Sequence, residues 1–233
     1  IVTKSRLEAS IAEEALKELI SNGQLIILEN GAQSITSDAL AIALPHWNGL
    51  QEKIFQIIET YHKDMPLRRG IPREELKSKL KITPRIFNSA ITLLVKQDSV
   101  RETDKSVSHP GHEIKFNGAD QLKVKELMRK FELNPYGGPS VKECQNEVGE
   151  EIVNALIELG ELATVSQDVI FRKKDYDEMV KKLRAEIQKK EQITLAEVRD
   201  LFNTSRKYAQ ALLEHLDSIG VTMRNGDFRK LRK

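Results

Sequence analysis

The sequence predicts a mainly α-helical protein with small β-hairpins (α+β), built from four tandem copies of one small module. The prediction rests on a pattern that recurs four times: an amphipathic helix, a break, and a short apolar hairpin. The breaks lie 75, 62 and 60 residues apart, at Gly23, Asp98, Gly160 and Gly220. With 233 residues, 39% of them hydrophobic, the chain has room for several packed domains.

We divide the chain into module 1 (1–45), module 2 (46–116), module 3 (117–172) and module 4 (173–233). The linkers between the modules are short, which predicts an elongated array. We place a hinge between modules 2 and 3, near Asn117-Gly118.

Module 1 is expected to be incomplete at its N-terminus. It has one helix, from about Ser5 to Ile20, and a hairpin from Gln24 to Ile35 that turns at residues 29–31. The two helices that open the other copies are absent. Either the copy is degenerate or the chain is a fragment cut inside this module. The start without a methionine favours a fragment with an upstream domain.

Module 2 should open with a helix from about His46, followed by a middle helix that begins at Pro72 and a third at Thr83-Pro84. Proline is well tolerated in the first turn of a helix, which places these two starts. The long hairpin loop carries His109 and His112. Without a nearby cysteine or paired carboxylates, two loop histidines are a poor metal site, and we expect ordinary loop residues.

Module 2 also carries a basic cluster that either touches RNA or forms the solvated side of a helix. The second interpretation is favoured, because charged side chains lie at the surface whatever their function. The cluster consists of Arg68, Arg69, Arg73, Lys77, Lys79, Lys81 and Arg85.

Module 3 is predicted to be a spacer or a protein-contact module. Ser140 and Glu143 form a capping box, which marks the start of its second helix. Its third helix, Glu150 to Leu159, places carboxylates outward, and a surface of that sign repels phosphate. Cys144 is the only cysteine and is expected to be a buried, inert thiol.

Module 4 has the layout of a helix-turn-helix followed by a two-stranded wing. Its opening helix should start at Asp175. A capping box of Thr194 and Glu197 then predicts a helix from Leu195 to Phe202. After the turn Asn203-Thr204, Ser205 can cap the next helix, whose apolar face comprises Ala209, Leu212, Leu213, Leu216 and Ile219. Two strands, Val221 to Arg224 and Phe228 to Leu231, flank Asn225-Gly226, a strong hairpin signal.

This layout defines winged-helix domains, and it makes module 4 the candidate for binding nucleic acid. The net charge is only +2, but modules 1 to 4 carry −3, +4, −4 and +5. Helix-turn-helix modules present the start of their second helix to nucleic acid. Charged residues also lie outside simply because they are charged. The candidate contacts are Arg199, Ser205, Arg206, Lys207, Tyr208, Gln210, Arg224, Asn225, Gly226, Arg229 and Lys230.

Other function classes find no support in the sequence. We find no phosphate-binding loop, dinucleotide fingerprint, zinc-protease motif or serine-hydrolase elbow, so we expect no enzymatic activity and no cofactor in this segment. No apolar run approaches the ~20 residues that span a membrane, and no signal peptide is evident. A single cysteine fits a reducing compartment. These features predict a cytoplasmic monomer.

The whole architecture resembles the C-terminal extension of the bacterial selenocysteine-specific elongation factors, the SelB family. The most specific part is the last forty residues, with TSRKYAQALLEHLD and the closing RNGDFRKLR. The resemblance implies that an N-terminal part, absent from this chain, binds GTP with Mg and carries selenocysteinyl-tRNA. It further implies that the extension binds an mRNA hairpin beside an in-frame UGA codon and tethers the factor to the ribosome.

The residues and the resemblance together give one hypothesis for module 4. The start of its second helix and its wing should grip the backbone of an RNA stem and loop. Tyr208 and Gln210 are candidates to meet a flipped-out base, although Tyr208 fits equally well packed against the wing. Backbone contacts are assigned to Arg199, Arg206, Lys207, Arg224, Arg229 and Lys230. Six such contacts predict that log K falls with log salt with a slope of about 4 to 5.

Two alternatives remain at this stage. Winged helices mostly read the major groove of duplex DNA, so a DNA-binding regulator is the second hypothesis. A protein-interaction scaffold, in which the basic tail is incidental, is the third. The basic cluster of module 2 is a further candidate for contact with ribosomal RNA or tRNA.

Overall fold

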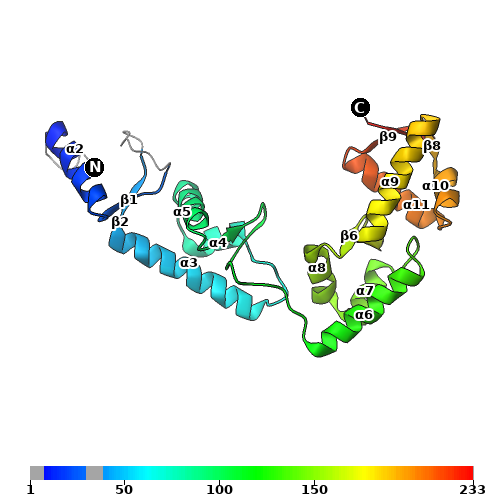
Figure 1. The fold of residues 1–233 in the computed structure, drawn as a ribbon, viewed down its shortest axis with the longest axis horizontal. Coiled ribbons are helices and arrows are strands. Elements are labelled where there is room, and N and C mark those ends of the chain that lie inside the picture. Colours follow the sequence, from blue (N-terminus) through cyan, green and yellow to red (C-terminus); the bar gives the residue numbers. More distant parts are fainter. Residues whose placement is uncertain (1–7, 30–38, 233) are drawn as a thin grey trace. The chain divides into compact units, whose positions relative to one another are not determined.

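The structure is a computed structural model that describes residues 8–29 and 39–232. It divides into two compact units, one up to Glu113 and one from Ile114, which we call unit 1 and unit 2. Figure 1 traces the helices and small sheets of each unit. Within the described ranges four antiparallel sheets form, one from each predicted module. The predicted fold class, mainly helical with small hairpins and tandem winged helices, is confirmed.

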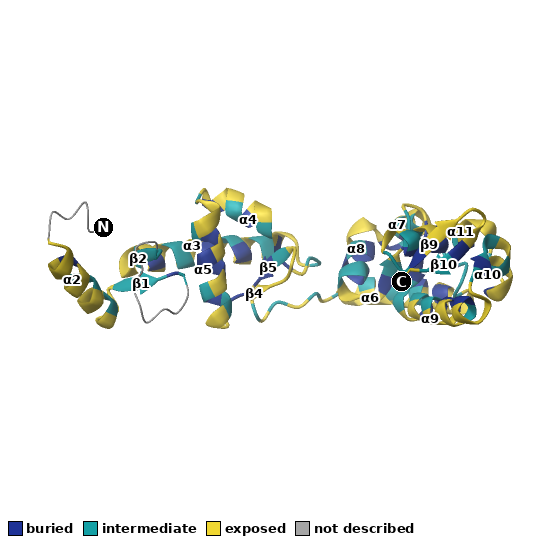
Figure 2. Cartoon of the chain, turned by 90° about the horizontal axis from the view of Figure 1, so that it is seen from above, coloured by how far each residue is buried: buried dark blue, intermediate teal, exposed yellow. Residues whose placement is uncertain are grey.

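Two helices of unit 1 begin at the proline start signals in the sequence. Thr83 caps one of them by accepting a hydrogen bond from the backbone N–H of Ile86. The elements in order are α2 (Ala9–Ser21), β1 (Leu25–Ile27), β2 (Ala41–Ala43), α3 (Leu44–Asp64), β3 (Ile71–Pro72), α4 (Arg73–Leu80), α5 (Pro84–Lys96), β4 (Arg101–Glu102) and β5 (Ser106–Ser108). The helices predicted at Pro72 and Thr83-Pro84 therefore begin within one residue of those positions. Helix α2 is largely exposed (Figure 2).

The hairpin of module 1 differs from the prediction. β1 pairs with β2, with Leu25 opposite Ala43, so the second strand lies well beyond Ile35. The physical reason is burial: Leu40 and Ile42 pack against the core of module 2, together with Leu28, which is 6% exposed. The start of the predicted helix at Ser5 and the predicted turn after Glu29 lie outside the described residues. α3 follows β2 directly, so it begins two residues before His46.

Unit 2 confirms both predicted capping boxes. Ser140 and Thr194 each accept a hydrogen bond from the N–H three residues on, and the glutamate there accepts one in return. The elements are α6 (Gly118–Leu133), α7 (Val141–Val148), α8 (Glu150–Leu159), β6 (Leu162–Thr164), β7 (Ile170–Arg172), α9 (Lys173–Lys190), β8 (Ile193–Thr194), α10 (Leu195–Leu201), α11 (Arg206–Ser218), β9 (Thr222–Asn225) and β10 (Phe228–Leu231). α9 begins at Lys173, two residues before the predicted start at Asp175. The Asp175 carboxylate is buried inside the first turn of the helix and binds Arg172 at 2.8 Å.

In each unit, residues of two modules contribute to one hydrophobic core cluster. In unit 2, Val165, Val169 and Phe171 from the hairpin of module 3 pack with the buried residues of α9, α10 and α11. In unit 1, Leu28 from module 1 packs with Trp47 and the other core residues of module 2. The wing of one module thus completes the core of the next. Across the described ranges, no helix is both long and apolar enough to cross a bilayer.

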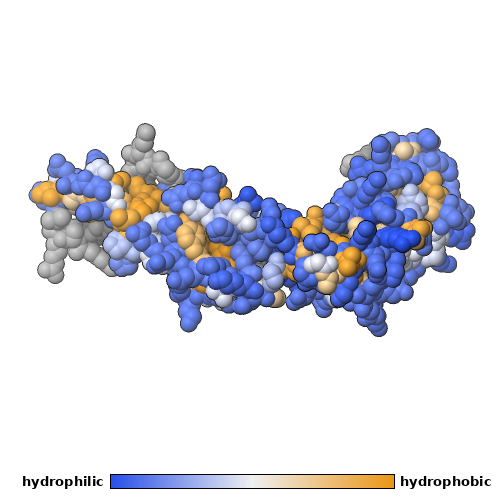
Figure 3. All heavy atoms as spheres, turned by 60° about the horizontal axis from the view of Figure 1, so that its bottom comes forward, coloured by the Kyte–Doolittle hydropathy of each residue, from blue (hydrophilic) through white to orange (hydrophobic). Residues whose placement is uncertain are grey.

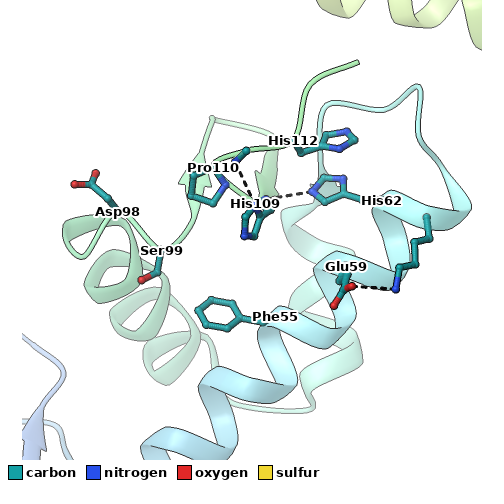
Figure 4. A pocket seen from close by; sticks show the side chains of 10 residues that line it. Phe55, Glu59, His62, Asp98, Ser99, His109, Pro110 and His112 are labelled. Carbon is teal, nitrogen blue, oxygen red and sulfur yellow. Dashed lines mark hydrogen bonds and ion pairs between the residues drawn. The ribbon is translucent and has the colours of Figure 1, made fainter. Parts of the chain in front are cut away.

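His62, His109 and His112 of module 2 form a small cluster at the end of α3 (Figure 4). The rings of His62 and His112 stack, with centroids 3.6 Å apart. The backbone N–H of His109 donates to Nε2 of His62 at 3.1 Å. The proton of a neutral His62 ring therefore lies on Nδ1, which is buried and has no hydrogen-bond partner in the structure. Among the described residues, no group of three or more potential ligands could hold a metal ion.

We expect this cluster to make unit 1 less stable at acidic pH. Burial, followed by the neighbouring His112 and His109, lowers the pKa of His62 from 6.5 to about 4. As the pH falls from 6.5 towards 4, the unfolded state takes up a proton at this ring and the folded state does not, so stability is lost in that window. Urea unfolding at several pH values measures the loss, and the variant His62→Gln should flatten the profile between these pH values.

The matched control is His46→Gln, at an exposed position on the same helix. It should leave the pH profile of the wild type unchanged. A wild-type profile that is flat between pH 6.5 and 4 would contradict the assignment.

Candidate nucleic-acid interface

The helix-turn-helix of module 4 consists of α10 and α11, joined at Phe202 to Ser205. α11 begins at Arg206, directly after the predicted cap Ser205, but the Ser205 side chain makes no capping hydrogen bond. Ala209, Leu212, Leu213 and Leu216 are buried as predicted. Ile219 is not: α11 ends at Ser218, the helical period stops there, and Ile219 is 53% exposed.

The wing forms with a register one residue away from the prediction. Asn225 pairs with Phe228, so the two-residue turn is Gly226-Asp227 rather than Asn225-Gly226. Gly226 adopts a φ of +62°, which suits a glycine at the first position of such a turn. β10 lies in the centre of its sheet, between β8 and β9.

Four of the predicted cations are available at the surface. Arg206 and Lys207 occupy the first turn of α11, where helix N–H groups add positive potential. The Lys207 ammonium lies 3.8 Å from Asp168 in the hairpin loop of module 3, and both side chains are more than half exposed. On the wing, Arg224 is exposed and Lys230 is half-buried. An exposed pair such as Lys207 with Asp168 contributes little to stability, so Lys207 can exchange Asp168 for a phosphate.

Two further predicted residues are exposed but engaged with neighbours on their own helices. Arg199 binds the adjacent Asp200, with Nη2 2.8 Å from Oδ1. Gln210 donates from Nε2 to Glu214 at 2.8 Å. Both side chains lie at the surface, and neither contact is buried. They remain accessible to a ligand.

Arg229 was assigned a phosphate contact, and the structure contradicts this. Its side chain is only 8% exposed, and Nε donates to Oδ2 of Asp217 at 2.7 Å. Thr222 donates to the other oxygen of the same carboxylate at 2.6 Å. The reason is the strand register, because Arg229 shares the inner face of the wing with the buried Ile193. Arg229 therefore joins the wing to α11.

Tyr208 is half-buried and is held by module 3. Its hydroxyl donates to the carbonyl of Gly138 in module 3, and its ring lies 5.8 Å from that of Phe171. Burial raises the pKa of the Tyr208 hydroxyl. A Cβ on Gly138 would lie 2.6 Å from the ring of Phe131, so the close packing of the Gly138 backbone against Phe131 requires glycine. Tyr208 thus joins the start of α11 to the preceding module.

The turn of the helix-turn-helix is held in the same way. Thr204 donates from its hydroxyl to the carbonyl of Tyr136. The Tyr136 ring meets the ring of Phe202 edge to face, with centroids 5.2 Å apart. The loop of module 3 that follows α6 therefore fixes both the turn and the first residues of α11.

The basic cluster of module 2 is largely paired with carboxylates. Arg85, the second residue of α5, makes a bidentate contact with Glu29 of module 1 at 2.6 and 2.5 Å. Its guanidinium is the largest cause of the lowered pKa of Glu29. Arg73 binds Glu102, Lys77 binds Glu74 and Lys79 lies 3.6 Å from Glu75. These contacts favour the solvated-face interpretation.

Two residues that the sequence reasoning did not select stand out on the wing. Phe228 is 38% exposed and Met223 is 51% exposed. Both lie on the face opposite Arg229. The alternation of β10 carried this signal, because any register that turns Arg229 inward turns Phe228 outward.

Two segments of the chain match family models described as "Elongation factor SelB, winged helix". The model for the second winged helix matches residues 55–108, which lie in module 2. The model for the third matches residues 185–231, which lie in module 4 and include α10, α11 and the wing. Both matches therefore fall on segments that the sequence analysis assigned to winged helices.

Two curated relatives are named selenocysteine-specific elongation factors. That of Desulfomicrobium baculatum is 29% identical over 198 residues, which cover 80% of this chain and 31% of that protein. That of Haemophilus influenzae is 23% identical over 196 residues, which cover 79% of this chain and 32% of that protein. The chain spans about a third of the length of these relatives.

Two solved structures are similar at a lower level. One is the mRNA-binding domain of elongation factor SelB from E. coli in complex with SECIS RNA, with 22% identity and a TM-score of 0.42, covering 51% of this chain and all of that one. The other is a bacterial selenocysteine-specific elongation factor, EF-Sec, with 16% identity and a TM-score of 0.46, covering 87% of this chain and 32% of that one.

The contacts of Arg229 predict that removing its partner lowers stability. In the variant Asp217→Ala the buried guanidinium loses its carboxylate, and the free energy of unfolding of unit 2 should fall by about 3 kcal/mol. Thermal or urea unfolding measures it. The matched control is Asp200→Ala, which breaks an exposed pair and should cost less than about 1 kcal/mol. Equal, small losses in both variants would show that Arg229 is not held as described.

Proposed function

Because its matched segments place the chain among the winged-helix domains of the SelB family, we propose that module 4 binds a hairpin in messenger RNA. By this contact it tethers a selenocysteine-specific elongation factor at an in-frame UGA codon for selenocysteine incorporation. One observation carries the proposal: cations gather at the start of α11 and on the wing of the most basic module, three of them exposed and Lys230 half-buried. They are Arg206, Lys207, Arg224 and Lys230.

The proposed contact is mainly electrostatic and is made to the RNA backbone. The major groove of A-form RNA is too deep and narrow for side chains to read, so a helix laid into it gains little. Arg206 and Lys207 lie at a helix N-terminus, where the aligned N–H groups also attract phosphate. Arg224 and Lys230 offer further cations from the neighbouring wing. Together they suit a bent, negatively charged surface such as the top of a hairpin.

Other predicted residues support the site without touching the ligand. Arg229 holds the wing to α11 through Asp217. Tyr208 and Thr204 hold α11 and its turn to module 3. Module 3 has a net charge of −4 and is unsuited to bind phosphate itself, so its role in the proposal is to support module 4. A rigid support lowers the entropy cost of ordering the cations on binding.

The proposal covers only the part that these domains play. The delivery of selenocysteinyl-tRNA and the hydrolysis of GTP are proposed for other parts of such a factor. The basic cluster of module 2 is not proposed as a nucleic-acid site, because four of its seven cations, Arg73, Lys77, Lys79 and Arg85, are paired with carboxylates within unit 1.

Binding should depend on salt in proportion to the phosphates contacted. Without Arg229, which is buried, and Arg199, which is engaged by Asp200, four cations remain, and log K should fall with log salt with a slope of about 3. In the variant Arg206→Gln we expect weaker binding to every hairpin sequence alike and a slope of about 2, since one phosphate contact is lost. Titrations of the whole chain with a labelled hairpin at several salt concentrations measure both quantities.

The matched control is Lys96→Gln, which removes one exposed cation from unit 1 and should leave the slope unchanged. Competition with duplex DNA of equal length separates the proposal from the DNA-binding alternative. Preference for the duplex, or a slope near zero, would show that the proposed function is wrong.

A further inference from the structure

The outer face of the wing combines apolar, amide and cationic side chains. Directly opposed residues of paired strands share a face, so Met223 lies with Lys230 and Asn225 lies with Phe228. The other face of the same strands carries Thr222, which is 1% exposed, and the buried Arg229. The face with Phe228 is therefore the one turned away from the core.

An exposed aromatic ring is unusual in this module. Of its Phe and Tyr side chains in the described part of the chain, Phe202 is buried, Tyr176 and Tyr208 are half-buried, and Phe228 is exposed. Its neighbour Met223 is also exposed. On the face drawn in Figure 3, hydrophilic side chains cover most of the surface and hydrophobic ones gather in separate patches. An apolar pair surrounded by polar groups marks an interaction site more often than a random exposure.

The charge around this pair selects the kind of ligand. Lys230 lies on the same face as the pair, whereas Arg224, which is paired with Arg229, lies on the other face of the wing. Two carboxylates belong to the neighbouring segments: Asp227 is exposed in the turn directly before Phe228, and Glu197 already binds Thr194 and Lys190. Lys230 supplies the cation on this face, and an apolar ring beside a cation suits a flat, uncharged base attached to a phosphate.

We propose that Phe228, with Met223 beside it, is the surface on which an unpaired base of the RNA stacks. The inference rests on the proposed function and adds to it the residue that distinguishes a hairpin with a protruding base from a fully paired one. Bases inside a stem have both faces covered by their neighbours, whereas a protruding base offers a free face to the ring. Lys230 is placed to meet the phosphate of that nucleotide, and the Asn225 amide is placed to meet an edge of the base.

This assignment replaces Tyr208, whose hydroxyl and ring are occupied by module 3. The assignment also predicts that any of the four bases is tolerated at the unpaired position. Every base has an aromatic face, so stacking alone favours an unpaired base over none and distinguishes poorly between the four. The preference should therefore respond to the removal of the base more than to its replacement.

The test compares two hairpins that differ only at one loop nucleotide, which is either intact or abasic. The whole chain should bind the intact hairpin at least about fivefold more tightly, the lower range of base stacking on an aromatic ring. The variant Phe228→Leu should bind both hairpins equally, with the affinity that the wild type shows for the abasic one. Phe228→Trp should keep the preference, and it also tests whether the effect of leucine comes from loss of the ring.

The matched control is Ile219→Ala, an apolar residue of the same module that is 53% exposed against 38% for Phe228, and it should keep the full preference. If Phe228→Leu keeps the preference, or weakens both hairpins alike, the stacking surface is wrong while the proposed function stands. If the wild type prefers neither hairpin over duplex DNA, the proposed function is wrong and the stacking surface falls with it.

Discussion

The packing of one module's wing into the core of the next is the constraint on which the rest of the structure depends. The hairpins of modules 1 and 3 have only two short strands each, too little to bury an apolar face alone. Val165, Val169 and Phe171 are nevertheless almost fully buried, because α9, α10 and α11 cover them. The modules are therefore paired rather than independent, because within each unit the hairpin of one module completes the core of the next.

The same docking leaves the two recognition helices in different states. In unit 1, Glu29 from the preceding module binds Arg85 at the second position of α5 with both carboxylate oxygens. In unit 2, the equivalent second position of α11 holds Lys207, whose nearest carboxylate is 3.8 Å away and largely exposed. One architecture thus neutralises the start of one helix and leaves the other accessible. The position of a single acidic side chain on a hairpin thus decides whether the cation at the start of the helix is neutralised.

Local signals in the sequence predicted most elements but few of the contacts between them. The capping boxes at Ser140 and Thr194, and the start of α5, depend on residues three apart in the chain, so they can be recognised from the sequence alone. Arg229 and Tyr208 were misassigned because their partners, Asp217 and Gly138, depend on strand register and on docking between modules. The hairpin of module 1 was misplaced for the same reason, since its second strand is selected by a core that belongs to module 2.

Shared cores also decide where the chain can be cut. A segment that begins at Lys173, the boundary suggested by the repeats, would lack Phe171 and leave an apolar hollow beside Tyr208. It would be expected to lose solubility or to associate with itself through that hollow. The smallest piece that retains a complete core around α11 starts near Ile114, at the division between the two compact bodies. For this architecture the sequence repeat and the folding unit are different lengths of chain.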